Sequence, residues 1–148
     1  MADSKIVNTL RELINTCRDG EKGYAQAAEK IRNPDLKSLF RQYSQERGRF
    51  ASQLEVEVGK LGEGVHQDQG HVSGTLHRAW LSVKESMGAD DHSILESVEQ
   101  GEDAAKESYQ KALQASLPDN VLAIVREQAQ AIFRAHDGIR ILRDQRAA

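Results

Sequence analysis

The chain has 148 residues and nearly balanced charge, with 20 Lys and Arg against 23 Asp and Glu and a formal net charge of −3. Such a chain has no overall field that would draw it to nucleic acid or to an anionic membrane, so we expect neither as a partner. Only two prolines and eleven glycines interrupt a composition that favours helix. Length and composition together predict an all-α protein with a single domain spanning residues 1 to 148.

The lone cysteine and the N-terminal residues bear on the cellular compartment. Cys17 has no second cysteine with which to form an internal disulfide, and its place on an apolar helical stripe favours a buried, inert thiol over a reactive one. Residues 1 to 5 lead directly into an amphipathic helix, without the apolar run of a signal peptide. Nowhere do about 20 apolar residues follow one another. We therefore predict a cytoplasmic protein.

The first predicted helix covers residues 4 to 31 and contains a carboxylate within its apolar stripe. Glu21 lies one turn after one stripe residue and one turn before the next, so we expect its side chain to point inward. The apolar residues of the stripe recur at spacings of three, four or seven: Ile6, Leu10, Leu13, Cys17, Tyr24, Ala28 and Ile31.

The second predicted helix covers residues 34 to 61 and forms a hairpin with the first. Pro34 suits the first turn of a helix and disfavours helical backbone in the residue before it, so the connection is short and the two helices are antiparallel. Glu46 and Arg47 interrupt the apolar stripe of this helix. Counting outward from the connection places them at the level of Glu21.

Residues 62 to 89 are predicted to form a long crossover between two hairpins. The crossover begins with a glycine-rich loop and continues as a helix over residues 72 to 87. Three histidines lie in this region (His66, His71 and His77), but the loop gives the first two no fixed ligand geometry, so solvated side chains are favoured over a metal cluster. The apolar side of the helix consists of Leu76, Trp80, Val83 and Met87.

A second hairpin, with helices over residues 90 to 116 and 118 to 143, repeats the pattern of the first. Glu102 holds the position that the inward glutamate holds in the first helix. Gln128 and His136 interrupt the apolar stripe of the last helix, about one turn to either side of Glu102. The sequence thus predicts two hairpins, each with a polar level at mid-height.

Several motifs spread along nearly the whole chain support a family resemblance. They are Asp19-Gly20-Glu21, Gly23-Tyr24, Ala27-Ala28, Glu46-Arg47, Phe50-Ala51, His77-Arg78-Ala79-Trp80, Gly101-Glu102, His136-Asp137, Ile139 and Leu142-Arg143-Asp144. With the two hairpins and the crossover, the chain resembles the ferritin-like four-helix bundle, and more closely a bacterial ferritin-like family catalogued as a domain of unknown function. The wider superfamily implies a connection with stress physiology.

The polar level has two alternative interpretations, of which the resemblance implies the metal site. Di-iron members of the superfamily use one glutamate from each of two helices and Glu-x-x-His from each of the other two. Here Glu21 and Glu102 match the two single glutamates, but both motif histidines and the fourth carboxylate are missing. A structural salt-bridge layer would comprise Glu21, Glu46, Arg47, Glu102 and Gln128. A divergent iron or manganese site would use Glu21, Glu46, Glu102 and His136.

Arg47 favours the structural layer, since a guanidinium between inward carboxylates neutralises them and fills the space of a dication. We therefore expect a non-enzymatic bundle that functions in binding or assembly, with no catalytic residues and no cofactor. The alternative is a metal-dependent oxidase or iron-handling protein. Trp80, on the amphipathic crossover helix, and the superfamily resemblance predict a homodimer. We also expect a protein partner, which the sequence does not identify.

Overall fold

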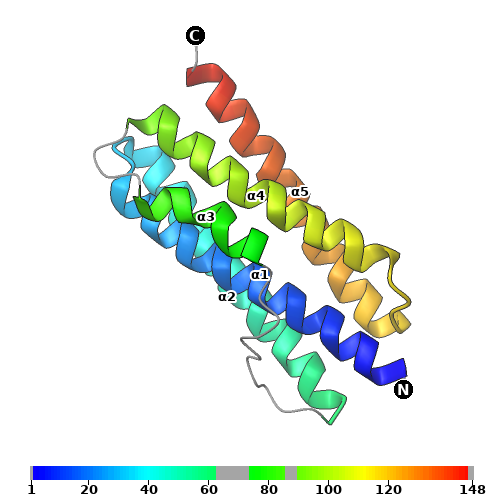
Figure 1. The fold of residues 1–148 in the computed structure, drawn as a ribbon. Coiled ribbons are helices and arrows are strands. Elements are labelled where there is room, and N and C mark those ends of the chain that lie inside the picture. The colour runs from blue at the N-terminus through cyan, green and yellow to red at the C-terminus, as the bar shows by residue number, and fades with distance from the viewer. Residues whose placement is uncertain (1, 63–73, 86–89, 147–148) are drawn as a thin grey trace.

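Five α-helices make up most of the computed structural model of the protein, which describes residues 2–62, 74–85 and 90–146. The described residues contain no strand, and the all-α prediction is confirmed. The loop histidines His66 and His71 lie outside the described residues, as does the side chain of His77. The helices, shown in Figure 1, are α1 (Ala2–Lys30), α2 (Pro34–Lys60), α3 (Gly74–Glu85), α4 (Asp91–Gln114) and α5 (Asp119–Arg146).

Four long helices form two antiparallel hairpins that lie side by side (Figure 1). One hairpin is α1 with α2 and the other is α4 with α5, and α1 packs along α4. Cys17, midway along α1, contacts Tyr109 in the C-terminal part of α4, whereas Asn33, just after α1, contacts Asp91 at the start of α4, so α1 and α4 run in opposite directions. Consequently α2 and α4 run the same way, which requires a crossover along the length of the bundle. None of the described helices has the length and apolar character to span a membrane.

The turn between α1 and α2 is tied to the second hairpin. Asn33 caps α2, with its side-chain oxygen accepting hydrogen bonds from the backbone amides of Asp35 and Leu36 at 2.9 and 3.1 Å. The carboxylate of Asp91 accepts from the backbone amides of Arg32 and Asn33 at 2.8 and 3.0 Å. These bonds fix the register of one hairpin against the other at this end of the bundle.

The apolar core divides into two clusters with a polar level between them. One cluster contains Tyr24, Phe40, Trp80 and Val98, and the other contains Cys17, Ala51, Ala105 and Ile132. Every long helix crosses from one cluster to the other through buried residues that are not apolar side chains. These include Gly20, Arg47, Glu102 and His136, on α1, α2, α4 and α5 in turn. The apolar inward faces of the four helices are thus interrupted at the same height along the bundle.

Helix α3 is held against α1 and α4 by Trp80, which is 5% exposed. A Cβ atom added at Gly23 or at Gly101 would overlap the indole ring, so the ring lies directly on the backbones of both helices. The Trp80 and Tyr24 ring centroids are 5.2 Å apart, with the rings tilted by 60°. The indole ring of Trp80 is therefore packed inside its own chain.

Candidate functional site

The centre of the bundle contains a fully buried ion pair between Arg47 of α2 and Glu102 of α4. Nη1 of Arg47 lies 2.7 Å from one carboxylate oxygen of Glu102, and Nη2 donates a hydrogen bond of 2.7 Å to the other. Both side chains are 0% exposed. A guanidinium can place two nitrogens against the two oxygens of one carboxylate, which lysine cannot do.

The sequence of α1 provides the room for this guanidinium. Gly20 faces it, and a Cβ atom at that position would lie 3.0 Å from Nη1 of Arg47. The guanidinium carbon lies 5.3 Å from the centroid of the Tyr24 ring, within range of a cation–π interaction. Burial by itself lowers the pKa of Arg47, but the charge and hydrogen bond of Glu102, together with Tyr24 and Cys17, outweigh that effect, and the pKa is raised. The arginine is therefore a permanent cation.

A second polar network lies beside the ion pair and joins all four long helices. Tyr109 of α4 donates to the side-chain oxygen of Gln128 of α5 at 2.7 Å. The amide nitrogen of Gln128 donates to the backbone oxygen of Phe50 and the side-chain oxygen of Gln53, both on α2. Cys17 of α1 has its sulfur 3.0 Å from the Tyr109 oxygen. Since the tyrosine proton is already used, the thiol is the donor in this contact.

Burial controls the protonation of the thiol in this network. Desolvation raises the pKa of Cys17 to about 11, although the contact with Tyr109 and the nearby charge of Arg47 act in the opposite direction. Because the thiolate is the reactive form, Cys17 is inert at neutral pH. Desolvation likewise raises the pKa of Tyr109 well above its ordinary value. The network supplies neither a nucleophile nor a base.

Glu21 and Glu46 do not join the buried ion pair. Glu21, expected to point inward, has a side chain that is 37% exposed and accepts a hydrogen bond of 3.1 Å from Arg18, which also binds Glu55 at 2.6 Å. The inward position on α1 belongs instead to its neighbour Gly20, because the helical stripe passes through residues 13, 17, 20 and 24. The side chain of Glu46 is only half-buried.

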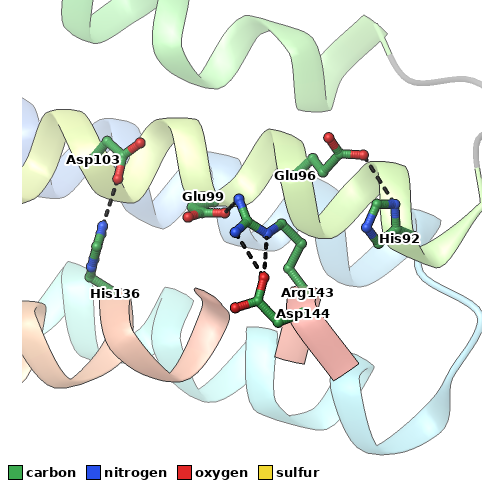
Figure 2. Close-up of polar contacts among 7 residues, drawn as sticks. All are labelled: His92, Glu96, Glu99, Asp103, His136, Arg143 and Asp144. Atoms are coloured by element: carbon green, nitrogen blue, oxygen red, sulfur yellow. Dashed lines mark hydrogen bonds and ion pairs between the residues drawn. The ribbon is translucent and has the colours of Figure 1, made fainter. Parts of the chain in front are cut away.

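His136 belongs to a polar seam between α4 and α5, shown in Figure 2. Its ring is 8% exposed, with Nε2 2.6 Å from a carboxylate oxygen of Asp103 and Nδ1 3.2 Å from Asp137. Further along the seam, Arg143 approaches Glu99 at 2.5 Å and Asp144 at 2.9 Å. The ring nitrogens of His136 therefore face carboxylates near the surface of the bundle, rather than Glu102.

The residues predicted for a metal site do not fit one ion. Both oxygens of Glu102 are occupied by Arg47, the Glu21 carboxylate faces Arg18, and the two nitrogens of His136 face Asp103 and Asp137. In the described ranges, no three His, Cys, Asp or Glu residues come together in a way that could hold a metal ion. The cation at the centre of the described bundle is a guanidinium.

The family whose sequence model matches residues 5–115 is described as "Domain of unknown function (DUF2383)". The chain belongs to this family. The DUF2383 match contains both partners of the central ion pair, as well as Trp80 and the two glycines on which it lies. It ends before α5, so Gln128 and His136 lie outside it. No curated protein matches the chain.

Three glycines within the DUF2383 match have a role that the sequence interpretation did not assign. Gly20 admits Arg47 to the core, while Gly23 and Gly101 admit Trp80. The available signal was a glycine at a stripe position inside a long helix, where it costs stability relative to alanine and so indicates a close packing requirement.

Proposed function

We propose that the protein is a non-enzymatic member of its family that functions in binding or assembly, with a helical core organised by an internal ion pair instead of a metal. The observation that carries this proposal is the bidentate contact of Arg47 with Glu102, both 0% exposed. The contact occupies the carboxylate that a central metal would require. A fixed cation needs no uptake, redox change or solvent channel.

The ion pair also gives the bundle a unique register, which is the best-attested role of buried polar groups. Arg47 joins the first hairpin to the second, and its charge is satisfied only when α2 and α4 are aligned at this level. The network of Tyr109 and Gln128 adds a second constraint close by. A rigid scaffold of this kind suits presentation of an outer surface to a partner.

The proposal includes a cytoplasmic homodimer. Trp80 is buried within its own chain, so the dimer interface must use other residues. In the described part of the chain, the large apolar side chains that are most exposed are Val56 at 57% on α2 and Ile141 at 54% on α5. Light scattering that shows only monomers at high protein concentration would contradict this part of the proposal.

Elemental analysis tests the main proposal. The protein is purified from cells grown with added iron and manganese, and the metal content per chain is compared with that of the Glu102→Gln variant. We expect both proteins to contain much less than about one metal ion per chain. About one tightly bound transition metal per chain, lost in the variant, would overturn the proposal in favour of a metal-dependent oxidase or iron-handling protein.

A further inference from the structure

A cleft between α1 and α3 combines the exposed edge of a tryptophan with two lysines. Its volume is about 240 Å³. Helix α1 contributes one face of four residues and α3 contributes three residues around its single tryptophan. The lining residues are Asp19, Lys22, Gly23, Gln26, Trp80, Leu81 and Lys84. None of them belongs to the central ion pair or to the seam between α4 and α5.

The tryptophan of this cleft is fixed in place. Trp80 lies on the backbones of two helices at Gly23 and Gly101, where an added Cβ atom would overlap the ring. Tyr24 supports the ring from within the core at a centroid distance of 5.2 Å. A ligand would therefore meet a preformed surface and would lose little free energy in ordering it.

The spacing between the two walls is also fixed. Lys30 of α1 donates hydrogen bonds to the backbone oxygens of Val83 at 2.7 Å and Lys84 at 2.5 Å, which lie at the C-terminal end of α3. An ammonium group at the end of a helix satisfies its last carbonyls and complements the helix dipole. Lys30 thus ties α3 to α1 and keeps a third positive charge close to the cleft.

The charges of the cleft select the class of ligand. Lys22 on α1 and Lys84 on α3 are both exposed and stand on opposite walls, so their ammonium groups can reach a shared anion. Asp19 supplies one negative charge, which leaves the lining with an excess of positive charge. Gln26 offers an amide with donors and an acceptor. Gly23, Trp80 and Leu81 supply the apolar part of the lining beside these charged and polar groups, and small-molecule sites combine both kinds of surface.

We propose that the cleft between α1 and α3 binds a small organic anion, in which a carboxylate is attached to a flat apolar body. The carboxylate lies between Lys22 and Lys84, and the flat body lies against Leu81 and the small part of Trp80 that remains exposed in the cleft. This inference gives the binding role proposed above a ligand class, and it rests on that role.

The test uses benzoate as the probe and the fluorescence of Trp80, the only tryptophan of the chain. Benzoate is added to the full-length protein, with and without prior treatment with a metal chelator. We expect a saturable change in Trp80 emission that is the same in both samples and weakens as salt is raised, since both lysines are exposed. Benzylamine, a cation of similar shape, should produce no such change.

The matched variants are Lys22→Gln with Lys84→Gln in the cleft, and Lys111→Gln on the exposed side of α4. Two exposed ionic contacts together account for about a tenfold difference in affinity, so the double variant should bind benzoate about tenfold more weakly. The Lys111 variant should bind benzoate as tightly as the wild type. An unchanged affinity in the double variant, or no binding in either sample, would contradict the proposal that the cleft binds an organic anion. Neither result would bear on the proposal that the core contains no metal. Binding that appears only when metal is present would instead contradict the proposed function.

Discussion

Arg47 and Glu102 face each other through two contacts of 2.7 Å at the only level where all four long helices leave the apolar core of the described bundle. Each side chain belongs to a different hairpin, and each is completely buried. Two charges in such a place are stable only as a pair, because either one alone would remain uncompensated in a medium of low dielectric constant. The buried charges of the core are therefore neutralised only when the two hairpins are assembled.

Replacing Arg47 by alanine should destabilise the protein strongly and in a pH-dependent way. The substitution leaves Glu102 buried without its partner, and breaking a buried pair from one side costs about 3–5 kcal/mol. Protonation of the carboxylate removes the uncompensated charge, so the variant should regain part of its stability in mild acid. Urea melts of both proteins at neutral pH and at a mildly acidic pH measure the effect.

The matched control is the double variant Arg47→Met with Glu102→Leu, which removes both charges. It should lose less stability than Arg47→Ala, since no unpaired charge remains. A small loss in Arg47→Ala, independent of pH, would mean that the pair is unimportant for folding.

The glycines beneath Trp80 should resist substitution. An alanine at Gly23 gains about 0.5–1 kcal/mol of helix propensity, but its Cβ atom overlaps the indole ring, and overpacking a core costs about 1–3 kcal/mol. We expect a net loss of stability and a red shift of tryptophan emission as the ring is displaced toward water. Gly59→Ala is the control, because nothing lies within 4 Å of its Cβ position on α2. That variant should be as stable as the wild type or slightly more stable.

The helices and their inward faces could be predicted from the sequence because hydrophobic periodicity depends on neighbours three or four residues away. Glu102 and Arg47 fall on inward positions by that count, and both are buried. The same helical spacing also places Glu21 on the inward face of α1, yet its side chain is 37% exposed. A shift of one residue, about 100° around a helix, separates it from the inward position of Gly20. Periodicity alone does not fix a rotation that depends on which partner side chain requires space.

Partners across the bundle could be predicted less well than inward faces. The pairing of Tyr24 with Tyr43 follows from counting away from the turn, and their ring centroids lie 5.2 Å apart. The partner of His136 does not follow from such a count. Asp103 lies on the flank of α4, and its distance of 2.6 Å from His136 depends on the relative rotation of α4 and α5. Sequence spacing within either helix contains no information on that rotation.

Acid should weaken the contact between His136 and Asp137 in a defined direction. The hydrogen bond with His136 holds the pKa of Asp137 below its ordinary value of 3.8. A carboxyl group whose pKa is lower in the folded state contributes its full stability above the ordinary pKa and loses it as the pH falls through the folded pKa. Asp137→Asn should therefore reduce the decline of the melting temperature below about pH 4. In a His136→Gln background the same substitution should have no such effect, and an equal effect in both backgrounds would exclude this contact as the cause.

Cys17 should react with a thiol reagent only when the protein unfolds. Burial raises its pKa to about 11, so at pH 8 only about one thiol in a thousand is ionised, and the sulfur is 0% exposed. Reaction with a disulfide reagent such as DTNB should accelerate across the urea transition, with a midpoint equal to that of unfolding. Ser52→Cys, which places a thiol at an exposed position of α2, gives the rate for an accessible group. Rapid reaction of Cys17 in the native wild type, at a rate close to that control, would contradict the buried network.

The Tyr109→Phe variant shows whether the hydrogen bonds protect the thiol. The ring remains in the core, but the thiol loses its acceptor and the side-chain oxygen of Gln128 loses its donor. Leaving a buried polar group unsatisfied costs about 1–3 kcal/mol, so the variant should unfold at lower urea concentration and its Cys17 should react earlier by the same shift. If the urea midpoint falls while the thiol reaction does not move with it, Cys17 is reached through a local opening of the bundle, and the joint protection by Tyr109 and Gln128 is excluded.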